Sequence, residues 1–295
     1  MSQYKSGFVA VIGRPNVGKS TMLNALLGQK IAIVSNKPQT TRNTIQAVLT
    51  KDQGQIVFLD TPGVHRPVHK LGEYMLKAAR TALKEVDTVC MLVDVSKWRK
   101  ADDHILTELA HVDTPVILIA NKIDLISQQE QEDFCQAAAE KYNFAQIIPV
   151  SAREENNLDF LVQSLFQFLP VGPQYYPDDW ITDHPERFVI AEFIREQILQ
   201  NTEDEIPHSV AVYIDEIKEN KKKGLVCIRA TIYVERDSQK GIVIGKQGAM
   251  LKKIGSEARQ QIETLLGSRV YLDMWVKVKK DWRDKPGSLH ELGYQ

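Results

Sequence analysis

The sequence predicts an α/β protein: a mostly parallel, doubly wound sheet, followed by a smaller α+β domain. Three observations lead to this fold class. First, short apolar runs alternate with helical patterns as far as residue 170, which is typical of a parallel sheet with helices on both faces. Second, a stretch with four prolines at 170–185 interrupts this alternation. Third, two long strand-like runs then follow each other directly, which indicates an antiparallel or mixed sheet.

The first part of the chain accounts for the larger sheet. Val, Ile and Leu dominate the expected strands without polar alternation, as in strands that are covered on both faces. Strands are expected at 7–13, 45–50, 55–60, 87–94, 115–120 and 146–150. Helices are expected between and after them, at 19–28, 68–85, 100–110, 128–141 and 155–169.

The second part begins with an expected helix at 186–200. Two strands, a short helix, a Gly-x-x-Gly loop, a longer helix and a last strand follow, with the strands at 207–218, 225–236 and 269–279 and the longer helix at 249–266. We therefore expect four segments, namely a first domain at 1–172, a linker at 173–185, a second domain at 186–285 and a tail at 286–295.

The composition is that of a globular protein with ordinary cores. The 295 residues are 43% hydrophobic and 25% charged. The cysteines Cys90, Cys135 and Cys227 lie far apart without a C-x-x-C pair, so we expect buried thiols in a reducing compartment instead of a metal ribbon or disulfides. No apolar run reaches spanning length and no leader is recognisable, so we expect a cytoplasmic protein.

The net charge of −1 conceals an asymmetry between two parts of the chain. Residues 240–285 contain eleven Lys and Arg against five acids, a local charge of +6, which leaves −7 for the rest. A polyanionic partner for this segment and a merely solvated surface explain the charge equally well.

A phosphate-binding loop is predicted between the first strand and the first helix. Residues 13–20 read Gly-Arg-Pro-Asn-Val-Gly-Lys-Ser and match G-x-x-x-x-G-K-[ST] in its proper context. Glycines let successive backbone N–H groups point at phosphate oxygens, and the following helix adds its positive end. Lys19 is expected to reach the β- and γ-phosphates, and the Ser20 hydroxyl is expected to bind Mg²⁺.

A metal-binding and γ-phosphate-sensing motif is predicted at the end of the third strand. Asp60 can bind Mg²⁺ directly or through water, and the Gly63 amide can approach the γ-phosphate because glycine has no Cβ. A hydroxyl from Thr40 or Thr41 can complete the metal shell when the γ-phosphate is present. We favour Thr41, although a plain surface loop competes with either threonine.

A guanine-specific pocket is predicted from two further strand ends. The Asp124 carboxylate can accept hydrogen bonds from guanine N1–H and N2–H₂, whereas adenine has no donors there. Asn121 can brace the pocket, the Lys122 stem can cover the ring, and the segment 151–153 can offer a backbone N–H to guanine O6. Because all these motifs follow strand ends in order, they are expected to surround one crevice.

The expected guanine-nucleotide site comprises Gly13, Arg14, Pro15, Asn16, Val17, Gly18, Lys19, Ser20, Thr21, Asp60, Thr61, Pro62, Gly63, Val64, Asn121, Lys122, Ile123, Asp124, Ser151, Ala152 and Arg153, with Ser20, Thr41 and Asp60 at the metal. In their order these motifs resemble the translation-factor class of GTPases, and residues 1–170 resemble its Era-type branch. The resemblance implies GTP and GDP binding with Mg²⁺, GTP hydrolysis, and a link to assembly of the small (30S) ribosomal subunit.

Hydrolysis requires a means of orienting water. Residue 64 follows the switch glycine and is valine, which cannot hydrogen-bond to water as the glutamine of Ras-type GTPases does. Turnover is therefore expected to be slow, with Lys19, Thr41, Gly63 and Asn16 as the contributing residues. By resemblance to related GTPases, Asn16 can hold K⁺ near the β–γ bridge, but an Asn that only caps a turn is equally compatible. We nominate no catalytic base, because His65 and His69 are expected to face solvent.

The basic segment contains a second motif. Gly245-Lys246-Gln247-Gly248 lies between two expected helices, after two strands and before a third, and residues 186–283 resemble a type II KH domain. Such a loop clamps about four nucleotides of a single strand. The expected RNA contacts are Ile242, Ile244, Gly245, Lys246, Gln247, Gly248, Lys252 and Lys253. By resemblance, the ligand is single-stranded RNA near the 3′ end of the small-subunit ribosomal RNA.

Other functions remain open at the level of sequence. The nucleotide can serve only to stabilise a binding protein whose KH domain acts alone, a reading that Val64 supports and the intact Lys19 and Asp124 oppose. Alternatively, lysines near 277–285 can face anionic lipid or a protein, giving a peripheral membrane or regulatory GTPase. No lipidation motif supports the membrane reading. We expect a monomer with at most weak contact with the inner face of the cell membrane.

Overall fold

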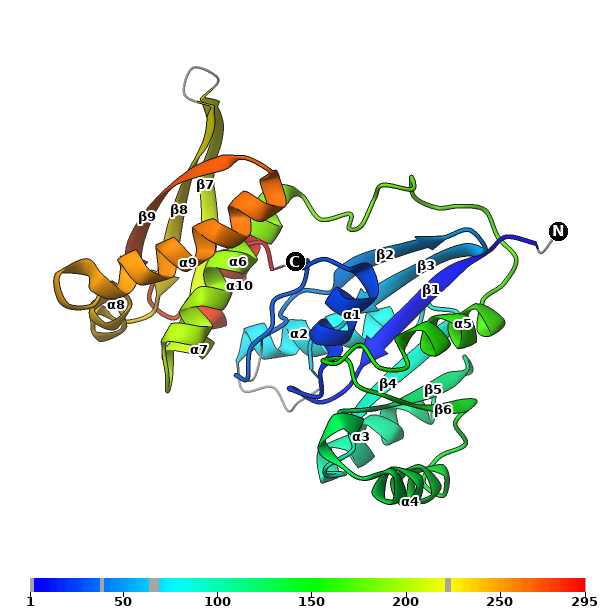
Figure 1. The fold of residues 1–295 in the computed structure, drawn as a ribbon. Coiled ribbons are helices and arrows are strands. Elements are labelled where there is room, and N and C mark those ends of the chain that lie inside the picture. The colour runs from blue at the N-terminus through cyan, green and yellow to red at the C-terminus, as the bar shows by residue number, and fades with distance from the viewer. Residues whose placement is uncertain (1–2, 38–39, 64–68, 221–223, 295) are drawn as a thin grey trace. The chain divides into compact units, whose positions relative to one another are not determined.

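The computed structural model describes residues 3–37, 40–63, 69–220 and 224–294 (Figure 1). They form two compact units, each treated by itself below. The first unit holds the described residues of Met1–Ala32, Thr41–Arg66 and Met75–Asp183. The second holds those of Ile33–Thr40, Pro67–Tyr74 and His184–Gln295.

The first unit is built on a six-stranded sheet in the order β2-β3-β1-β4-β5-β6. Neighbouring strands are parallel except for β2 and β3, which form an antiparallel pair. This confirms the predicted mostly parallel sheet. The strands are β1 (Lys5–Ile12), β2 (Ile45–Lys51), β3 (Gly54–Asp60), β4 (Thr88–Asp94), β5 (Val116–Asn121) and β6 (Gln146–Val150).

Helices follow the strands as predicted, and their apolar faces explain the packing. Every residue of β4 and β5 is buried, as expected for strands covered on both faces. Alternate strand residues such as Ala10 and Met91 share one core with Ile105 and Leu109 of α3. The helices of this unit are α1 (Lys19–Leu27), α2 (Lys70–Ala82), α3 (Lys100–Leu109), α4 (Gln128–Ala139) and α5 (Leu158–Phe168), with the 3₁₀ turn η1 (Ile123–Leu125) after β5; the first residues of α2 fall in the second unit.

The proline-rich stretch predicted to be a linker packs on the first unit as far as Asp183. The buried Gln55 side chain accepts hydrogen bonds from the backbone N–H groups of Tyr175 and Tyr176 at 2.9 and 3.0 Å. The Val48 N–H donates to the Ile181 carbonyl at 2.8 Å. These backbone groups need partners once they leave water, and composition alone does not reveal that the partners exist.

The second unit contains a three-stranded mixed sheet in the order β7-β8-β9. β7 (Ala211–Asn220) and β8 (Leu225–Val234) are antiparallel, and β9 (Arg269–Val278) is parallel to β8. The predicted order of helix, two strands, two helices and strand is confirmed. The helices are α6 (Glu186–Asn201), α7 (Ile206–Ser209), α8 (Asp237–Ile244), α9 (Ala249–Leu266) and α10 (Pro286–Glu291), with 3₁₀ turns η2 (Lys246–Gly248) and η3 (Trp282–Asp284).

One strand boundary in the second unit differs from the prediction. The strand expected from residue 207 begins only at Ala211, because the short helix α7 occupies the preceding residues. The segment that follows β9 is packed, since Trp282 is fully buried and its ring stacks on that of Tyr294 with the centroids 5.8 Å apart. A single apolar residue such as Leu289 forms no periodic pattern in the sequence, so its burial is not evident from the sequence alone.

Two smaller expectations concern cysteines and membranes. Cys90 is buried, but Cys135 and Cys227 are only half-buried, so the prediction of buried thiols is right for Cys90 alone. Among the residues that the structure describes, no helix has the length and apolar character needed to cross a bilayer.

Candidate functional site

The loop between β1 and α1 has a backbone that requires glycine. Gly13 and Gly18 have φ angles of +154° and +103°. A Cβ on Gly13 would lie 2.5 Å from the Leu92 carbonyl oxygen, and one on Gly18 would lie 2.2 Å from Asn121 Nδ2. Asn16 also adopts a left-handed conformation, with φ of 67°. The two glycines therefore set both the curvature of the loop and its close approach to β5.

Lys19 is held inside this loop. Its side chain is buried, and Nζ donates to the Gly13 and Arg14 carbonyl oxygens at 3.0 and 3.3 Å. Burial lowers the pKa of the ammonium, while the nearby Asp60 carboxylate opposes that shift. A phosphate placed in the loop would supply the negative charge that this buried cation lacks.

The three predicted metal-binding side chains come together beside the loop. Ser20 Oγ donates to Asp60 Oδ2 at 3.0 Å and lies 3.3 Å from Thr41 Oγ1, which is 3.4 Å from the same carboxylate oxygen. Asp60 is fully buried, and its Oδ1 has no hydrogen-bond partner in the part of the chain that the structure describes. Burial raises the pKa of Asp60 to about 6, against the opposing effects of Lys19, Ser20 and Thr41. A buried, unpaired carboxylate oxygen beside two hydroxyls suits a hard cation such as Mg²⁺.

Asn121 ties the phosphate loop to the expected base pocket. Its Nδ2 donates to the Val17 carbonyl at 2.7 Å, and its Oδ1 accepts from the Ala152 N–H at 3.0 Å. Ser151 Oγ donates to Asp124 Oδ1 at 2.6 Å, which orients an otherwise exposed carboxylate. The three predicted motifs after β1, β5 and β6 therefore meet at one edge of the sheet.

Two carboxylates that sequence reasoning missed hold the motif residues in place. Lys122 Nζ contacts Asp94 Oδ2 at 2.7 Å, and Arg14 Nε donates to the fully buried Asp102 at 3.2 Å. The Arg14 side chain is thus directed toward α3, so its expected nucleotide contact can come only from the backbone. Asp94 is the last residue of the buried strand β4, as Asp60 is of β3, and that position was the available signal.

The remaining predicted residues differ in their position relative to the site. Thr61 Oγ1 donates to the Val11 carbonyl at 2.9 Å, and a Cβ on Gly63 would lie 3.0 Å from the Pro15 ring. The Arg153 side chain is exposed and lies 3.7 Å from Glu154, so it does not point into the site. Val64 lies outside the described residues.

The stretch before Thr41 belongs to the second unit. Ile33 joins the hydrophobic core of that unit. The Val34 N–H donates to Glu196 Oε1 at 2.8 Å, and Arg195 donates to the Thr40 carbonyl. Arg195 and Glu196 are both buried in α6. Sequence reasoning missed these contacts, although two adjacent charges in a largely apolar helix were a signal.

The Gly-x-x-Gly loop also depends on its glycines. Gly245 and Gly248 have φ angles of +73° and +79°, and α9 starts at the next residue. A Cβ on Gly245 would lie 2.7 Å from that of Met250, whereas one on Gly248 would meet nothing within 4 Å. The loop is therefore packed on one side and open at Gly248, where a ligand backbone can approach.

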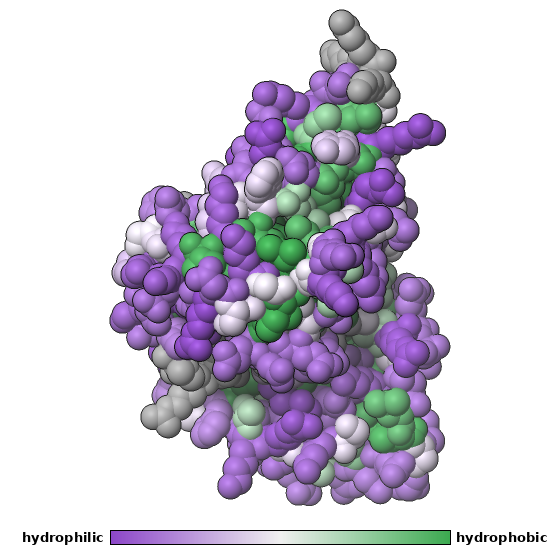
Figure 2. All heavy atoms as spheres, turned by 90° about the vertical axis from the view of Figure 1, so that its left-hand side faces the viewer, coloured by the Kyte–Doolittle hydropathy of each residue, from purple (hydrophilic) through white to green (hydrophobic). Residues whose placement is uncertain are grey.

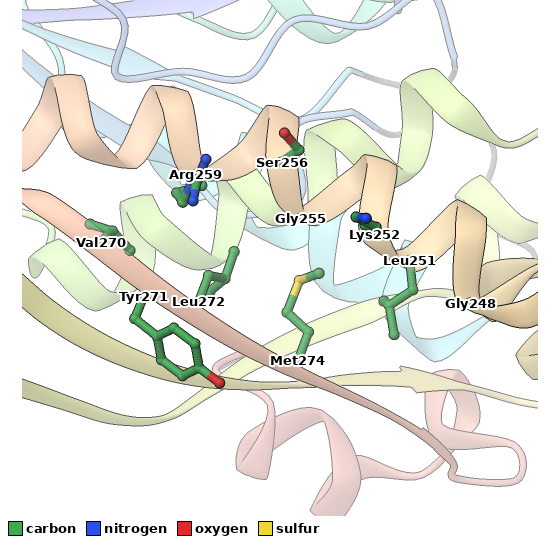
Figure 3. A pocket seen from close by; sticks show the side chains of 10 residues that line it. All are labelled: Gly248, Leu251, Lys252, Gly255, Ser256, Arg259, Val270, Tyr271, Leu272 and Met274. Carbon is green, nitrogen blue, oxygen red and sulfur yellow. The ribbon is translucent and has the colours of Figure 1, made fainter.

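A groove begins at this opening and runs between α9 and β9 (Figure 3). It has a volume of about 470 Å³. Figure 2 shows apolar side chains gathered between hydrophilic ones on the side of the molecule that is turned toward the viewer. Met274 reaches toward Gly255, where a Cβ would lie 2.7 Å from its terminal methyl, so the glycine leaves room for the Met274 side chain in the groove. The lining residues are Gly248, Leu251, Lys252, Gly255, Ser256, Arg259, Val270, Tyr271, Leu272 and Met274.

The groove includes only part of the predicted RNA site. Gly248 and Lys252 line it, but Lys253 lies 3.9 Å from Glu257 instead, and Ile244 packs on the core. Ile242 is 54% exposed beside the loop. Arg259 was missed, although it lies seven residues after Lys252 and thus on the same helix face.

The comparisons with known proteins agree with both halves of this architecture. A family model described as 50S ribosome-binding GTPase matches residues 8–122, and a KH-domain model matches residues 205–283. GTPase Era of Staphylococcus haemolyticus (strain JCSC1435) is 52% identical over 296 residues, which cover 100% of this chain and 98% of that protein.

Two solved structures are similar over almost the whole chain. A crystal structure of Era in complex with MgGDPNP and nucleotides 1506–1542 of 16S ribosomal RNA has a TM-score of 0.95 at 40% identity, covering 99% of each chain. A variant of Aquifex aeolicus Era bound to GDP and AlF₄⁻ has a TM-score of 0.94 at 40% identity, covering 98% of this chain and 99% of that one.

The fold and the two sites define a P-loop GTPase with a C-terminal KH domain. The identity along the entire chain narrows this class further. The chain belongs to the Era family of GTPases and binds and hydrolyses GTP.

Proposed function

We propose that this GTPase binds single-stranded RNA near the 3′ end of the small-subunit ribosomal RNA and assists assembly of the 30S subunit. The observation that carries the proposal is the groove between α9 and β9, which opens at Gly248 in a chain that also contains a guanine-nucleotide fold. The similar Era that holds both MgGDPNP and a 16S ribosomal RNA segment supports it.

In the nucleotide site, each residue has a distinct role. Lys19 and the backbone N–H groups of residues 13–20 bind the phosphates, and Asp124 accepts hydrogen bonds from the guanine edge. Ser20, Thr41 and Asp60 would hold Mg²⁺, which would supply positive charge next to the phosphate oxygens. Gly63 offers its N–H to the γ-phosphate. The site is thus sensitive to the presence of that phosphate through Thr41 and Gly63.

Hydrolysis in this chain proceeds without a glutamine after Gly63, and we propose that K⁺ at Asn16 supplies part of the missing charge stabilisation. We expect turnover several-fold faster in K⁺ than in Na⁺ at equal ionic strength. Asn16→Ala and Asn16→Gly should both abolish this difference. The glycine variant is the control for backbone strain, because φ at this position is 67°. Equal wild-type rates in the two salts would rule the cation out.

In the RNA site, the chemistry comes from backbone and cations. Gly248 lets the sugar–phosphate chain approach, and the first turn of α9 favours phosphate. Lys246 and Lys252 add charge, while Leu251 and Met274 provide an apolar floor for bases. This combination is the one by which KH domains hold about four nucleotides.

The experiment that tests the function is a binding measurement with matched glycine variants. Gly248→Asp places a carboxylate where a phosphate would lie, and Gly224→Asp makes the same change in the β7–β8 turn. Both positions have positive φ (+79° and +57°), and a Cβ added at either one would meet no atom within 4 Å. We expect Gly248→Asp to weaken binding of short single-stranded ribosomal RNA at least 10-fold and Gly224→Asp to change it less than twofold. Equal binding by both variants would refute the clamp.

Nucleotide state and RNA binding are linked, in our proposal, through residues 33–40. This stretch belongs to the second unit and is bonded to α6, whereas the adjacent Thr41 lies beside Ser20 and Asp60. A change at Thr41 is therefore transmitted along one peptide bond to a segment that α6 holds. The sequence alone suggests that the region around 68–85 couples nucleotide state to RNA binding. Its described residues 69–74 also belong to the second unit, where Lys70 N–H donates to Asp284 at 3.2 Å.

The cytoplasmic location, the weak contact with the cell membrane and the monomeric state stay predictions. Flotation with anionic vesicles at two salt concentrations tests the membrane alternative. Salt-sensitive binding to such vesicles, together with no binding to RNA, would favour it over the proposed function.

A further inference from the structure

We propose that the outer face of the β7-β8-β9 sheet is a second RNA-contact surface, on which the strand leaving the α9–β9 groove stacks its bases against Trp275 and Tyr271. This inference rests on the proposed RNA binding and extends it to a different face of the second unit. The surface is called the aromatic sheet face below and comprises Tyr213, Asp215, Arg229, Thr231, Tyr271, Asp273, Trp275 and Lys277.

Strand register places these residues on one side of the sheet. Thr231 is paired with Tyr213 on β7 and with Trp275 on β9, and Arg229 is paired with Asp273. The intervening residues, such as Ile232 and Val276, point the other way, into the core beneath α6 and α9. One face of the sheet is therefore covered by helices, and the aromatic sheet face is open.

The aromatic side chains on this face are unusually exposed. Tyr213, Tyr271 and Trp275 are 41%, 62% and 59% exposed, and they are the exposed large aromatics among the described residues of the second unit. A hollow of about 420 Å³ lies beside Trp275, lined also by Arg229 and Lys277. Three aromatics gathered on one open face indicate a binding surface, because folding gains nothing from leaving them in water.

The charges on the face are balanced in number, with Asp215 and Asp273 against Arg229 and Lys277, but they are not paired evenly. Each acid is already bonded to a neighbour: Asp215 accepts from Thr231 at 2.8 Å, and Asp273 lies 3.5 Å from Arg229 and accepts from Trp275 Nε1 at 3.3 Å. Lys277, in contrast, takes part in no ion pair within the described ranges. Exposed aromatics next to a cation outside any ion pair are an arrangement that can hold a single-stranded nucleic acid through base stacking and phosphate contact.

The aromatic sheet face is also continuous with the groove. β9 is the edge strand, and Tyr271 lines the groove while its ring extends to the side of β9 away from α9 (Figure 3). Trp275 lies four residues further along the same strand face, about 13 Å away at the rise of a β-strand. An RNA strand that crosses β9 at Tyr271 thus meets Trp275 next, with space for nucleotides between them.

The test compares RNAs of two lengths on the full chain loaded with a GTP analogue. The probes are fluorescent single-stranded oligonucleotides from the 3′ end of small-subunit ribosomal RNA, one of six nucleotides and two of fourteen, extended at either end. We expect Trp275→Ala to weaken one of the longer RNAs about 5- to 50-fold and to leave the six-nucleotide RNA within twofold. Trp275→Phe should retain most of the affinity, and Trp180→Ala, which removes a 46% exposed tryptophan from the first unit, should have no effect.

Other outcomes separate this inference from the proposed function. Unchanged binding of all three RNAs by Trp275→Ala would overturn the second surface and leave the groove intact. This is the result expected if the face binds a protein instead of RNA. An equal loss for short and long RNAs would also overturn it, because it would indicate a structural role. Failure of the wild-type chain to bind even the six-nucleotide RNA would overturn both proposals.

Discussion

Individual residues show that a sequence motif identifies the side chain that is predicted to contact the ligand, but not the neighbouring group that fixes its orientation. Lys122 was predicted from its motif, but its ammonium is positioned by Asp94, at 2.7 Å. Arg14 lies in the phosphate loop, but its guanidinium is bound to the buried Asp102 on α3. Such supporting groups come from distant parts of the chain, so only their proximity in space reveals them.

At the residue scale, Asp124→Asn tests the guanine pocket. An amide offers one donor and one acceptor where guanine presents two donors, so we expect GTP affinity to fall at least 100-fold. Xanthosine triphosphate, which has a carbonyl in place of the guanine amino group, should bind better than GTP to the variant. Calorimetry of both nucleotides measures this. Asp133→Asn on the exposed surface of α4 is the matched control and should bind GTP as the wild type does.

A second residue-scale prediction separates two adjacent lysines. Lys252 lines the groove, whereas Lys253 lies 3.9 Å from Glu257 and does not. Lys252→Ala should weaken RNA binding and lower the slope of log Kd against log salt by about 0.7, the value for one single-strand phosphate contact. Lys253→Ala should change the slope by much less. Identical slopes for the two variants would show that the groove does not follow the RNA backbone.

Among the elements, α6 and the C-terminal segment depart furthest from what local sequence suggests. Ten of the sixteen residues of α6 are buried, including Glu192, Arg195, Glu196 and Gln197, so this helix has no solvated polar face. Arg195 instead pairs with Glu192 and donates to the Thr40 carbonyl, and Glu196 accepts from the Val34 N–H. The C-terminal segment likewise gains its order from Trp282, whose Nε1 donates to the Ser209 carbonyl at 2.9 Å.

At this scale, Leu289→Ala tests whether the C-terminal segment is part of the second unit's core. Leu289 is 6% exposed, so we expect the free energy of unfolding to fall by about 2–3 kcal/mol. Leu125→Ala removes the same atoms from a leucine that is 59% exposed and should cost less than about 1 kcal/mol. Urea unfolding followed by tryptophan fluorescence compares them. A loose tail would make the two leucines equivalent.

On the scale of the whole molecule, the two compact units do not coincide with two continuous stretches of sequence. The described residues of 33–40 and residues 69–74 interrupt the chain of the first unit but belong to the second. The first stretch adjoins Thr41, and the second begins six residues after Gly63; both of these residues are predicted to sense the γ-phosphate. A chain organised in this way can report the state of a nucleotide to the unit that contains the KH domain without a separate signalling element.

Arg195→Met tests this link. The variant loses the bond to Thr40 and leaves the Glu192 carboxylate unpaired, so we expect it to be about 3–5 kcal/mol less stable. The double variant with Glu192→Gln removes the unpaired charge and should recover most of the stability. It should still show a smaller ratio of RNA affinities between the GTP-analogue and GDP states than the wild type. An unchanged ratio in the double variant would rule out Arg195 as the link.

The sequence by itself determined the order of the elements, the sheet class and the chemical motifs. Apolar runs in the strands and the spacing of glycines are local signals, and the structure has the strands of the first unit within about two residues of where they were expected. The sequence also predicted that Ser20, Thr41 and Asp60 share a metal site, and the structure brings these side chains within hydrogen-bond distance of one another. These predictions succeed because the carboxyl ends of parallel strands lie at the same edge of a sheet, so residues that follow them come close together.

Only the tertiary structure decided which residues complete each site. Arg259 and Tyr271 line the groove, Asp94 and Asp102 hold motif side chains, and the expected linker packs against Gln55. Each of these depends on a contact between positions far apart in the chain. No local pattern of hydrophobicity or charge encodes such a contact, because its energy arises only when folding removes both partners from water.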